Sequence, residues 1–157
     1  MKPVRTWEEA AKMAELCRQA SGRVITTNGV FDLLHRGHVE YLAAARQLGD
    51  LLLVGINSDA SVKKLNKGPG RPLNPEEARA VVLAALRSVD GVCVFSEDTP
   101  LAWLSAVRPD IHVKGGDYRP EDLPETELLK SWGGKTMVLP FVAGYSTTSL
   151  IERSKKL

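Results

Sequence analysis

Two histidines, three residues apart, follow a glycine turn near the start of the chain. His35 and His38 would lie on one face of a helical turn, and Gly37 between them would let a ligand approach the backbone closely. The spacing predicts a strand over residues 23–27 before them and a helix over residues 39–48 after them. Such a junction offers backbone N–H groups, a helix N-terminus and two imidazoles to one anion. The pattern therefore predicts a phosphate-binding site.

Two other interpretations of the histidine pair stay open at this point. A His-x-x-His pair can bind zinc, but Cys17 and Cys93 lie far away in sequence and no third ligand stands at metal spacing. The pair could also be an ordinary surface feature of a helix cap. Agreement between strand, glycine, histidines and helix favours the phosphate site, and we expect no metal ligands in the protein itself.

The composition is that of a water-soluble globular protein. The 157 residues are 43% hydrophobic and 25% charged, which suits one domain over residues 1–157 with a sizeable core. A net charge of +2 gives no argument for nucleic-acid binding. Apolar runs such as residues 51–56 have strand length, the N-terminus is charged and leads into a helix, and two cysteines suggest reduced packing residues. We expect a cytoplasmic protein with no signal peptide and no membrane partner.

Strand and helix patterns alternate along the chain. Strands are predicted over residues 23–27, 51–57, 92–95, 111–114 and 136–139, and helices over residues 7–20, 39–48, 58–65, 75–86, 99–108, 124–132 and 146–155. Gly49 is the expected C-cap of the second helix, and Asn74 the expected N-cap of the fourth, with Pro75 at its first position. The alternation predicts an α/β, Rossmann-like three-layer fold with a five-stranded parallel sheet. Ligands should bind beyond the carboxyl ends of the strands, so the loops after strands one, two, four and five are the candidates.

Basic residues gather in the loop after the second strand. Lys63, Lys64, Lys67 and Arg71 surround a Gly-Pro-Gly sequence. One interpretation is a solvated basic face; the other is a mobile lid that neutralises a triphosphate. The lid is favoured because the loop leaves the carboxyl end of a strand, but spacing alone does not tell which lysine acts.

The loops after the fourth and fifth strands also carry candidate ligand groups. Residues 114–118 contain two glycines that allow close backbone approach, and Asp117 either faces the base, ribose or sugar pocket or is only a turn residue. Residues 144–149 place four hydroxyl groups at one helix N-terminus, more than a single cap requires. With the free N–H groups of that helix they would form a triphosphate cradle.

The run from Gly29 to His38 is similar to the H-x-G-H signature of the nucleotidyltransferase superfamily. Further segments resemble the family of adenylyltransferases that convert D-glycero-β-D-manno-heptose 1-phosphate to ADP-heptose for lipopolysaccharide and related surface polymers. These segments are residues 57–59, 70–76, 95–100, 113–118 and 144–148. In many bacteria that domain is fused to a sugar kinase. This sequence holds no kinase half, so it resembles the free-standing form.

The resemblance implies transfer of AMP from ATP to the heptose 1-phosphate, with Mg²⁺ and release of pyrophosphate. It implies catalytic roles for His35, His38, Lys64 and Arg79, the last through a Glu-x-Arg helix start. The residues implied to contact the nucleotide or sugar phosphate are Thr27, Asn28, Gly29, Phe31, Gly37, Lys67, Lys114, Gly115, Asp117, Gly144, Ser146, Thr147 and Thr148. The expected partners are ATP and a sugar 1-phosphate, without nucleic acid, and assembly into a homo-oligomer stays open.

Other classes of protein share parts of this pattern. Glycerol-3-phosphate cytidylyltransferases, which use CTP, are the related family that forms the alternative. They typically carry an arginine where this chain has residues 141–143 and Met-Gly-Asp-Asp where it has residues 114–117, and both differences favour the heptose family. A non-catalytic nucleotide-binding module would be expected to lack the histidines, and a purely structural domain would not need polar glycine-rich loops at one sheet edge. A class I aminoacyl-tRNA synthetase is excluded by the chain's length and the missing Lys-Met-Ser-Lys-Ser segment.

We expect His35→Ala and His38→Ala each to reduce kcat far more than they weaken ATP binding. Loss of one preorganised donor to a phosphate whose charge redistributes in the transition state costs about 2.7–4 kcal/mol, or ~10²–10³ in rate. The measurement is steady-state kcat beside direct ATP binding and a melting curve for each variant. If the pair only capped a helix, each variant would lose about 1 kcal/mol of stability and keep near-normal kcat.

Overall fold

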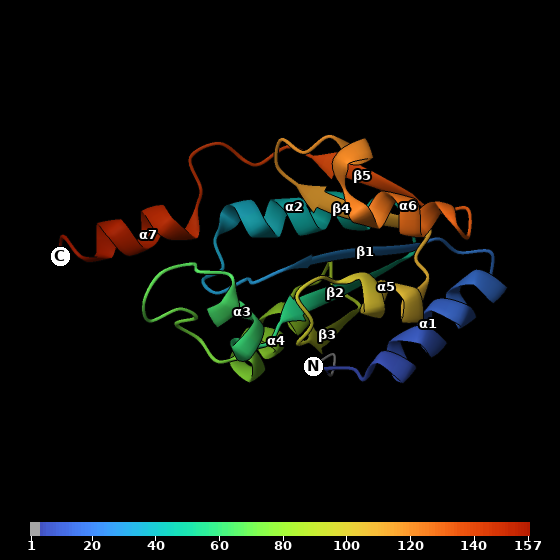
Figure 1. Cartoon of the computed structure of the whole chain (residues 1–157), viewed down its shortest axis with the longest axis horizontal. Helices are drawn as coiled ribbons and strands as arrows, with labels where there is room; N and C mark the ends of the chain where they lie inside the picture. Colours follow the sequence, from blue (N-terminus) through green and yellow to red (C-terminus); the bar gives the residue numbers. More distant parts are fainter. Residues whose placement is uncertain (1–3) are drawn as a thin grey trace.

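The computed structural model describes residues 4–157, and it has one parallel sheet between two layers of helices (Figure 1). The strands are β1 (Val24–Gly29), β2 (Leu51–Asn57), β3 (Gly91–Phe95), β4 (Ile111–Gly115) and β5 (Lys135–Leu139), in the order β3-β2-β1-β4-β5. All four neighbouring pairs are parallel. The predicted α/β, Rossmann-like fold with five parallel strands is confirmed.

Helices lie between consecutive strands, as the alternation of patterns predicted, with one more before the first strand and one after the last. They are α1 (Trp7–Gln19), α2 (Arg36–Arg46), α3 (Asp59–Lys64), α4 (Glu76–Ala84), α5 (Leu101–Val107), α6 (Pro124–Lys130) and α7 (Thr147–Ser154), with a short 3-10 helix η1 (Pro120–Asp122) before α6. None of the helices within residues 4–157 has both the length and the apolar character needed to cross a membrane. Figure 1 shows α7 reaching away from the sheet, with the C-terminus at its far end.

Two apolar clusters form the core, one on each face of the sheet. Leu52, Val54 and Ile56 of β2 face α2 and α4, whereas Leu53 faces the layer of α1, α5 and α6. Side chains of successive strand residues point to opposite faces, so an almost continuous apolar run is what a strand buried on both sides requires. The second face also holds Cys93, which is a free thiol, as the predicted reduced state requires.

Two predicted helix caps are wrong. Pro75, not Asn74, is the N-cap of α4, and it makes no side-chain cap bond. The Asn74 side chain instead donates to the backbone oxygen of Asp32 at 2.8 Å. Helix α2 ends at Arg46 with Gln47 as its cap, so Gly49 is not the cap. A Cβ at Gly49 would lie 2.7 Å from the Arg23 carbonyl oxygen, so close backbone packing explains this glycine.

We expect Gly55→Ala to destabilise the fold by about 1–3 kcal/mol, because it overpacks the core. A Cβ at this position in β2 would lie 2.7 Å from Cζ3 of Trp103, whose side chain is fully buried. Urea denaturation of Gly55→Ala, Trp103→Leu and the double variant measures the coupling. Gly55→Ala should cost less free energy of unfolding in the Trp103→Leu background. An equal cost in both backgrounds would show that the indole ring is not the obstacle.

Candidate active site

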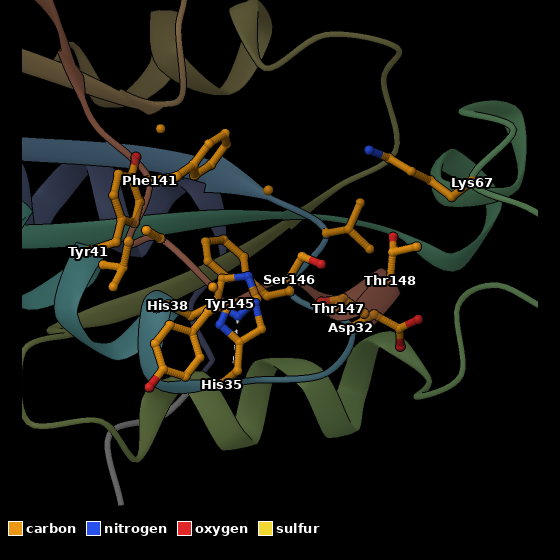
Figure 2. A pocket seen from close by; sticks show the side chains of 18 of the residues that line it. Asp32, His35, His38, Tyr41, Lys67, Phe141, Tyr145, Ser146, Thr147 and Thr148 are labelled. Carbon is orange, nitrogen blue, oxygen red and sulfur yellow. Dashed lines mark hydrogen bonds between the residues drawn. The ribbon is translucent and has the colours of Figure 1, made fainter. Parts of the chain in front are cut away.

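A cavity of about 610 Å³ opens at the carboxyl ends of the strands, where loops from four parts of the chain meet (Figure 2). Its walls come from the β1–α2 loop, the start of α2, the loop after α3, the end of β4 and the loop between β5 and α7. This is the edge that the parallel fold predicts for ligands. The lining residues include Asn28, Gly29, Phe31, Asp32, His35, Gly37, His38, Tyr41, Lys67, Arg71, Gly115, Phe141, Gly144, Tyr145, Ser146, Thr147 and Thr148.

The two histidines stack at the beginning of α2. His35 is the N-cap residue and His38 lies in the first turn, and their ring centroids are 3.8 Å apart with planes inclined by 21°. The predicted shared face is therefore confirmed. The backbone N–H of His35 donates over 3.4 Å to Nδ1 of His38, which leaves the proton of a neutral ring on Nε2. Nδ1 of His35 is buried and has no hydrogen-bond partner among residues 4–157.

Burial disfavours the charged form of both imidazoles. Burial lowers the pKa of His35, and burial together with the neighbouring His35 lowers the pKa of His38 to about 4. A neutral ring still presents one N–H donor, so the pair can donate hydrogen bonds without holding positive charge. In the free protein the histidines therefore supply directed donors rather than cations.

Glycines in this site make room for side chains as well as for a ligand. A Cβ on Gly37 would lie 3.0 Å from Nδ1 of His35 and 3.1 Å from Cβ of Tyr145. A Cβ on Gly29 would lie 2.9 Å from the ring of Phe31, which has a φ of 50°. A non-glycine residue in this left-handed region is strained, and such strain gathers at functional sites. The prediction was that these glycines let a ligand approach the backbone closely. In the structure the rings of His35 and Phe31 already lie close to them.

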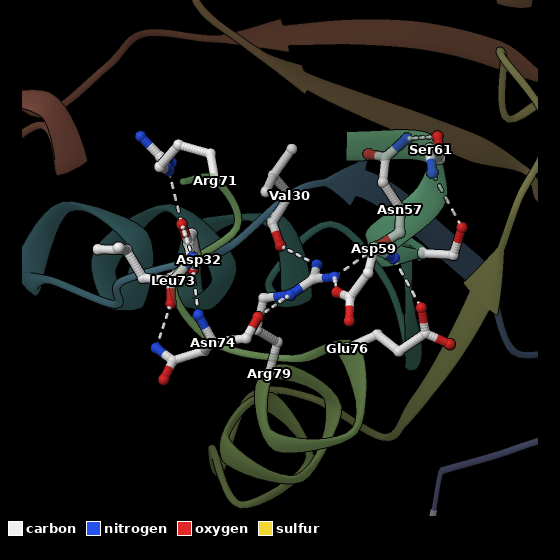
Figure 3. A network of polar contacts seen from close by, with 11 residues as sticks. Val30, Asp32, Asn57, Asp59, Ser61, Arg71, Leu73, Asn74, Glu76 and Arg79 are labelled. Carbon is white, nitrogen blue, oxygen red and sulfur yellow. Dashed lines mark hydrogen bonds and ion pairs between the residues drawn. The ribbon is translucent and has the colours of Figure 1, made fainter. Parts of the chain in front are cut away.

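Asp32 joins the histidine loop to the basic loop (Figure 3). Its carboxylate accepts from Nε of Arg71 at 2.6 Å and from the backbone N–H groups of Leu73 and Asn74 at 2.8–2.9 Å. Burial by itself raises the pKa of Asp32, but the N–H groups of Asn74 and Leu73 and the Arg71 guanidinium outweigh it, and the pKa lies below its usual value. A carboxylate held in this way fixes the base of the basic loop beside the histidines.

Arg79 lies behind the cavity and does not line it. Its guanidinium is fully buried and donates to the carbonyl oxygens of Asn74, Val30 and Asn57 at 2.7–3.0 Å, and to Asp59 at 2.7 Å (Figure 3). These four bonds hold together the ends of β1 and β2 and the start of α4. Contact of Arg79 with a phosphate stays a prediction.

Only part of the basic loop, residues 63–71, lines the cavity. Lys67 extends its amine toward the cavity, and Arg71 lines it while paired with Asp32 (Figure 2). Lys64 lies outside, where its ammonium pairs with Asp98 at 3.4 Å and both side chains are largely exposed. Gly68 and Gly70 have positive φ values and open space around them. The segment between Lys67 and Arg71 is thus the exposed part of the predicted lid, with room for its two glycines to move.

The last helix begins at the cavity. The Ser146 hydroxyl accepts from the backbone N–H of Ser149 at 3.0 Å, and the Thr147 hydroxyl donates to the Leu33 carbonyl oxygen at 3.2 Å. Thr148 and Gly144 line the same wall. Ser146, Thr147 and Thr148 thus line the same cavity as the histidines, whereas Ser149 does not, and contact of these hydroxyl groups with phosphate stays a prediction.

Three other predicted ligand residues lie outside the cavity lining. Thr27 is buried, with its hydroxyl bonded to Val113 and Tyr41, and Asp117 is exposed in the loop after β4. Lys114 points beneath the cavity, toward Asn28 at 3.0 Å and Glu125 at 2.9 Å. Their roles as ligand contacts stay predictions.

Three aromatic residues of the cavity, Tyr41, Phe141 and Tyr145, were missed by the sequence reasoning, which had predicted Phe31. Phe141 is 72% exposed, and its ring packs on the backbone of Gly115 and Gly116, while Tyr145 lies beside His35 with ring centroids 6.1 Å apart. Phe141 and Tyr145 both precede the hydroxyl-rich segment 146–149 in the chain. The signal available in the sequence was the glycine pair 115–116, which leaves room for an aromatic ring. Tyr41 was missed because its position on α2 fits the ordinary pattern of an amphipathic helix.

Comparison with known proteins agrees with this geometry. The model of the family described as cytidylyltransferase-like matches residues 26–153. The chain is 57% identical over 136 residues to the bifunctional protein HldE of Trichlorobacter lovleyi, covering 86% of the chain and 28% of that protein. It is 52% identical over 150 residues to the bifunctional protein HldE of Syntrophotalea carbinolica, covering 96% of the chain and 30% of that protein. The chain thus spans less than a third of the length of these relatives.

A solved structure shares the architecture. The crystal structure of the lipopolysaccharide core biosynthesis protein from Thermoplasma volcanium superposes with a TM-score of 0.65 at 26% sequence identity. The match covers 77% of this chain and 97% of that protein. This likeness supports the three-layer fold that the strand order establishes.

We expect the lowered pKa of His38 to make stability depend on pH between about 4 and about 6.5. The unfolded state binds a proton in this window and the folded state does not, so stability is full above pH 6.5 and falls as the pH falls toward 4. In His38→Asn the amide oxygen can replace Nδ1 but does not titrate. The free energy of unfolding of this variant should therefore change with pH by roughly 1–2 kcal/mol less than that of the wild type. This is less than the full pKa shift would give, because part of the His38 ring faces water.

Urea denaturation of wild type and His38→Asn across pH 4–7.5 checks this expectation. The difference between their free energies of unfolding should grow as the pH rises to 6.5 and then stay level. The lowered pKa of Asp32 acts at lower pH and is shared by both proteins, so it does not contribute to the difference. A difference that is constant over the whole range would contradict a neutral His38.

Proposed function

The chain belongs to the cytidylyltransferase-like family, and from this premise we propose that it transfers AMP from ATP to D-glycero-β-D-manno-heptose 1-phosphate, giving ADP-heptose and pyrophosphate. The observation that carries the proposal is the stacked pair of imidazoles, His35 and His38, in the same cavity as the N-terminus of α7. Directed donors on two sides of one cavity suit a phosphate chain lying between them.

The choice of substrates rests on the sequence resemblance and on the relatives. The heptose-type segments at residues 113–118 and 144–148 lie at the ends of β4 and β5, where the cavity opens. The relatives named bifunctional are far longer than this chain, which fits a domain that is elsewhere fused to a kinase. The structural neighbour is named for lipopolysaccharide core biosynthesis.

The proposed reaction needs no side-chain nucleophile. An oxygen of the sugar phosphate attacks the α-phosphorus of ATP, the bond to the bridging oxygen breaks, and pyrophosphate leaves in line. The protein contributes position and donors: Nε2–H of His38 and the His35 ring toward the phosphate oxygens, and the α7 N-terminus toward the rest of the chain. Because burial lowers the pKa of both rings in the free protein, the proposal assigns part of the compensation of the developing charge to Mg²⁺ and to cationic side chains.

Mg²⁺ would supply part of that charge as a companion of ATP. No cluster of three His, Cys, Asp or Glu side chains within residues 4–157 is arranged to hold a metal, and the oxygens of Asp32 already accept hydrogen bonds. The donor set therefore suits Mg²⁺ carried on phosphate oxygens, a form in which the ion needs few protein ligands.

The basic residues then divide into two proposed roles. Lys67, on the unpacked segment of the basic loop, would close over the phosphates, and Lys64 would reach them only after that loop moves. Arg79, with its four buried bonds, would act by holding the cavity walls in place. Gly115 and Asp117 would face the base or the sugar.

We expect pyrophosphate release, in the presence of Mg²⁺, to be fastest with ATP and the heptose 1-phosphate. The measurement is coupled pyrophosphate detection across ATP, CTP, GTP and UTP, each with the heptose 1-phosphate, glucose 1-phosphate and glycerol 3-phosphate. His35→Ala serves as the control for contaminating activity. Faster turnover with CTP and glycerol 3-phosphate would replace the proposal with the cytidylyltransferase alternative.

A further inference from the structure

A row of polar side chains crosses from β4 to β1 beneath the cavity. Thr26 and His112 are register partners, and both are fully buried. Nδ1 of His112 lies 2.8 Å from the Thr26 hydroxyl, and its Nε2 lies 3.2 Å from Oδ1 of Asn28. Lys114 donates to the same oxygen at 3.0 Å. Because Asn28 lines the cavity, the row ends at the candidate site.

The donors and acceptors of this row can be arranged in only one consistent way. The Lys114 ammonium is a donor without any acceptor, and the buried Glu125 holds it at 2.9 Å. The Asn28 atom that faces Lys114 must therefore be the amide oxygen. That oxygen also faces Nε2 of His112, so Nε2 carries the proton. Nδ1 then accepts from the Thr26 hydroxyl.

The surroundings of His112 agree with this neutral form. Burial and the nearby charge of Lys114 lower the pKa of His112 to about 3, so the ring is uncharged over the physiological range. A charged ring would need an acceptor at both nitrogens. The Thr26 oxygen could accept from a protonated Nδ1 only if its own hydroxyl proton pointed elsewhere. Among residues 4–157 that proton has no other acceptor.

The arrangement leaves the Asn28 Nδ2 group for the cavity. No residue within 4–157 accepts a hydrogen bond from it. A flipped amide would put this NH₂ group against the Lys114 ammonium and the Nε2–H of His112, which are both donors. The other polar groups nearby, the histidine rings and the hydroxyls of Ser146 and Thr148, also present donors to the cavity. A ligand rich in acceptor oxygens is what such a wall suits.

We infer that His112 is a positioning residue that locks the Asn28 amide so that Nδ2 donates to a phosphate oxygen of the bound substrate. The identity of that substrate rests on the proposed function, and the oxygen belongs either to the nucleotide or to the sugar phosphate. His112 does not touch the ligand and acts only through Asn28. The alternative is a buried histidine that merely satisfies its neighbours and packs the sheet.

The test compares His112→Leu with His112→Gln. The glutamine amide can replace Nε2–H as the donor to Asn28, whereas leucine cannot. Loss of an aligned bond to a charged oxygen should weaken binding about tenfold or more. His112→Leu should therefore raise the Kd of one ligand, ATP·Mg²⁺ or heptose 1-phosphate, by that factor, and His112→Gln should stay within about twofold of wild type. Calorimetry with each ligand separately identifies which phosphate is held.

A double-variant cycle separates positioning from packing. Asn28→Ala should weaken the same ligand, and His112→Leu added to it should bring no further loss, because its effect passes through Asn28. Effects that add, an unchanged Kd for both ligands in His112→Leu, or equal losses in His112→Gln and His112→Leu would each overturn the inference. Melting curves accompany every variant, and if His112→Leu does not fold, the tautomer of the wild-type His112 ring still decides the inference.

A measurement without ligand keeps the inference separate from the proposed function. Long-range ¹H–¹⁵N NMR of the wild-type protein reports the tautomer of His112 directly, and we expect the neutral ring with its proton on Nε2. Asn28→Ala, which removes the acceptor for Nε2–H, should introduce the other tautomer, in which Nδ1–H donates to the Thr26 hydroxyl, whereas Thr26→Val should keep the proton on Nε2. A wild-type proton on Nδ1 would overturn the inference whatever the enzyme transfers. Binding without pyrophosphate release would contradict the proposed function alone.

Discussion

The cavity depends on the buried carboxylate of Asp32. A carboxylate removed from water is tolerated only when it is paired and hydrogen-bonded. Asp32 meets that condition with partners that all come from the basic loop, namely the Arg71 side chain and the backbone of Leu73 and Asn74. The loop that bears the histidines and the loop that bears the lysines are therefore positioned by one contact. Arg79 adds a second, since its guanidinium bonds to carbonyl groups from three separate segments of the same region.

The cations around the cavity differ in what their charge can do. Arg71, Arg79 and Lys114 are paired with carboxylates that are buried or partly buried, so their charge serves to shape the walls. Burial lowers the pKa of both histidines and so disfavours their charged form. Lys67 lies at the cavity without a recorded ion pair among residues 4–157. A phosphate ligand would thus meet a rigid wall of neutral donors, with positive charge arriving from a loop and from the ion that it carries itself.

Much of the fold can be predicted from the hydrophobic pattern of the sequence, and the two wrong cap predictions have a common origin. The five strands were predicted within two residues at each end because a strand buried on both faces must be continuously apolar. Asn74 was predicted as a helix cap because its type is typical there. The structure instead directs its amide to the Asp32 backbone, forty-two residues away in sequence. Gly49 was likewise assigned to a local role, although the constraint on it comes from the Arg23 carbonyl group.

The sequence by itself determined the fold class and which sheet edge bears the cavity, because periodicity and alternation are properties of the chain. It also determined the stacking of His35 and His38, since a spacing of three residues on one helical turn is local geometry. Only the tertiary structure decided that Lys67 lines the cavity while Lys64 does not, that Arg79 and Lys114 lie behind it, and that Phe141 packs on Gly116. The physical reason is that the place of a long side chain depends on partners from distant segments, and their distance in space is set only when the sheet and its loops have come together.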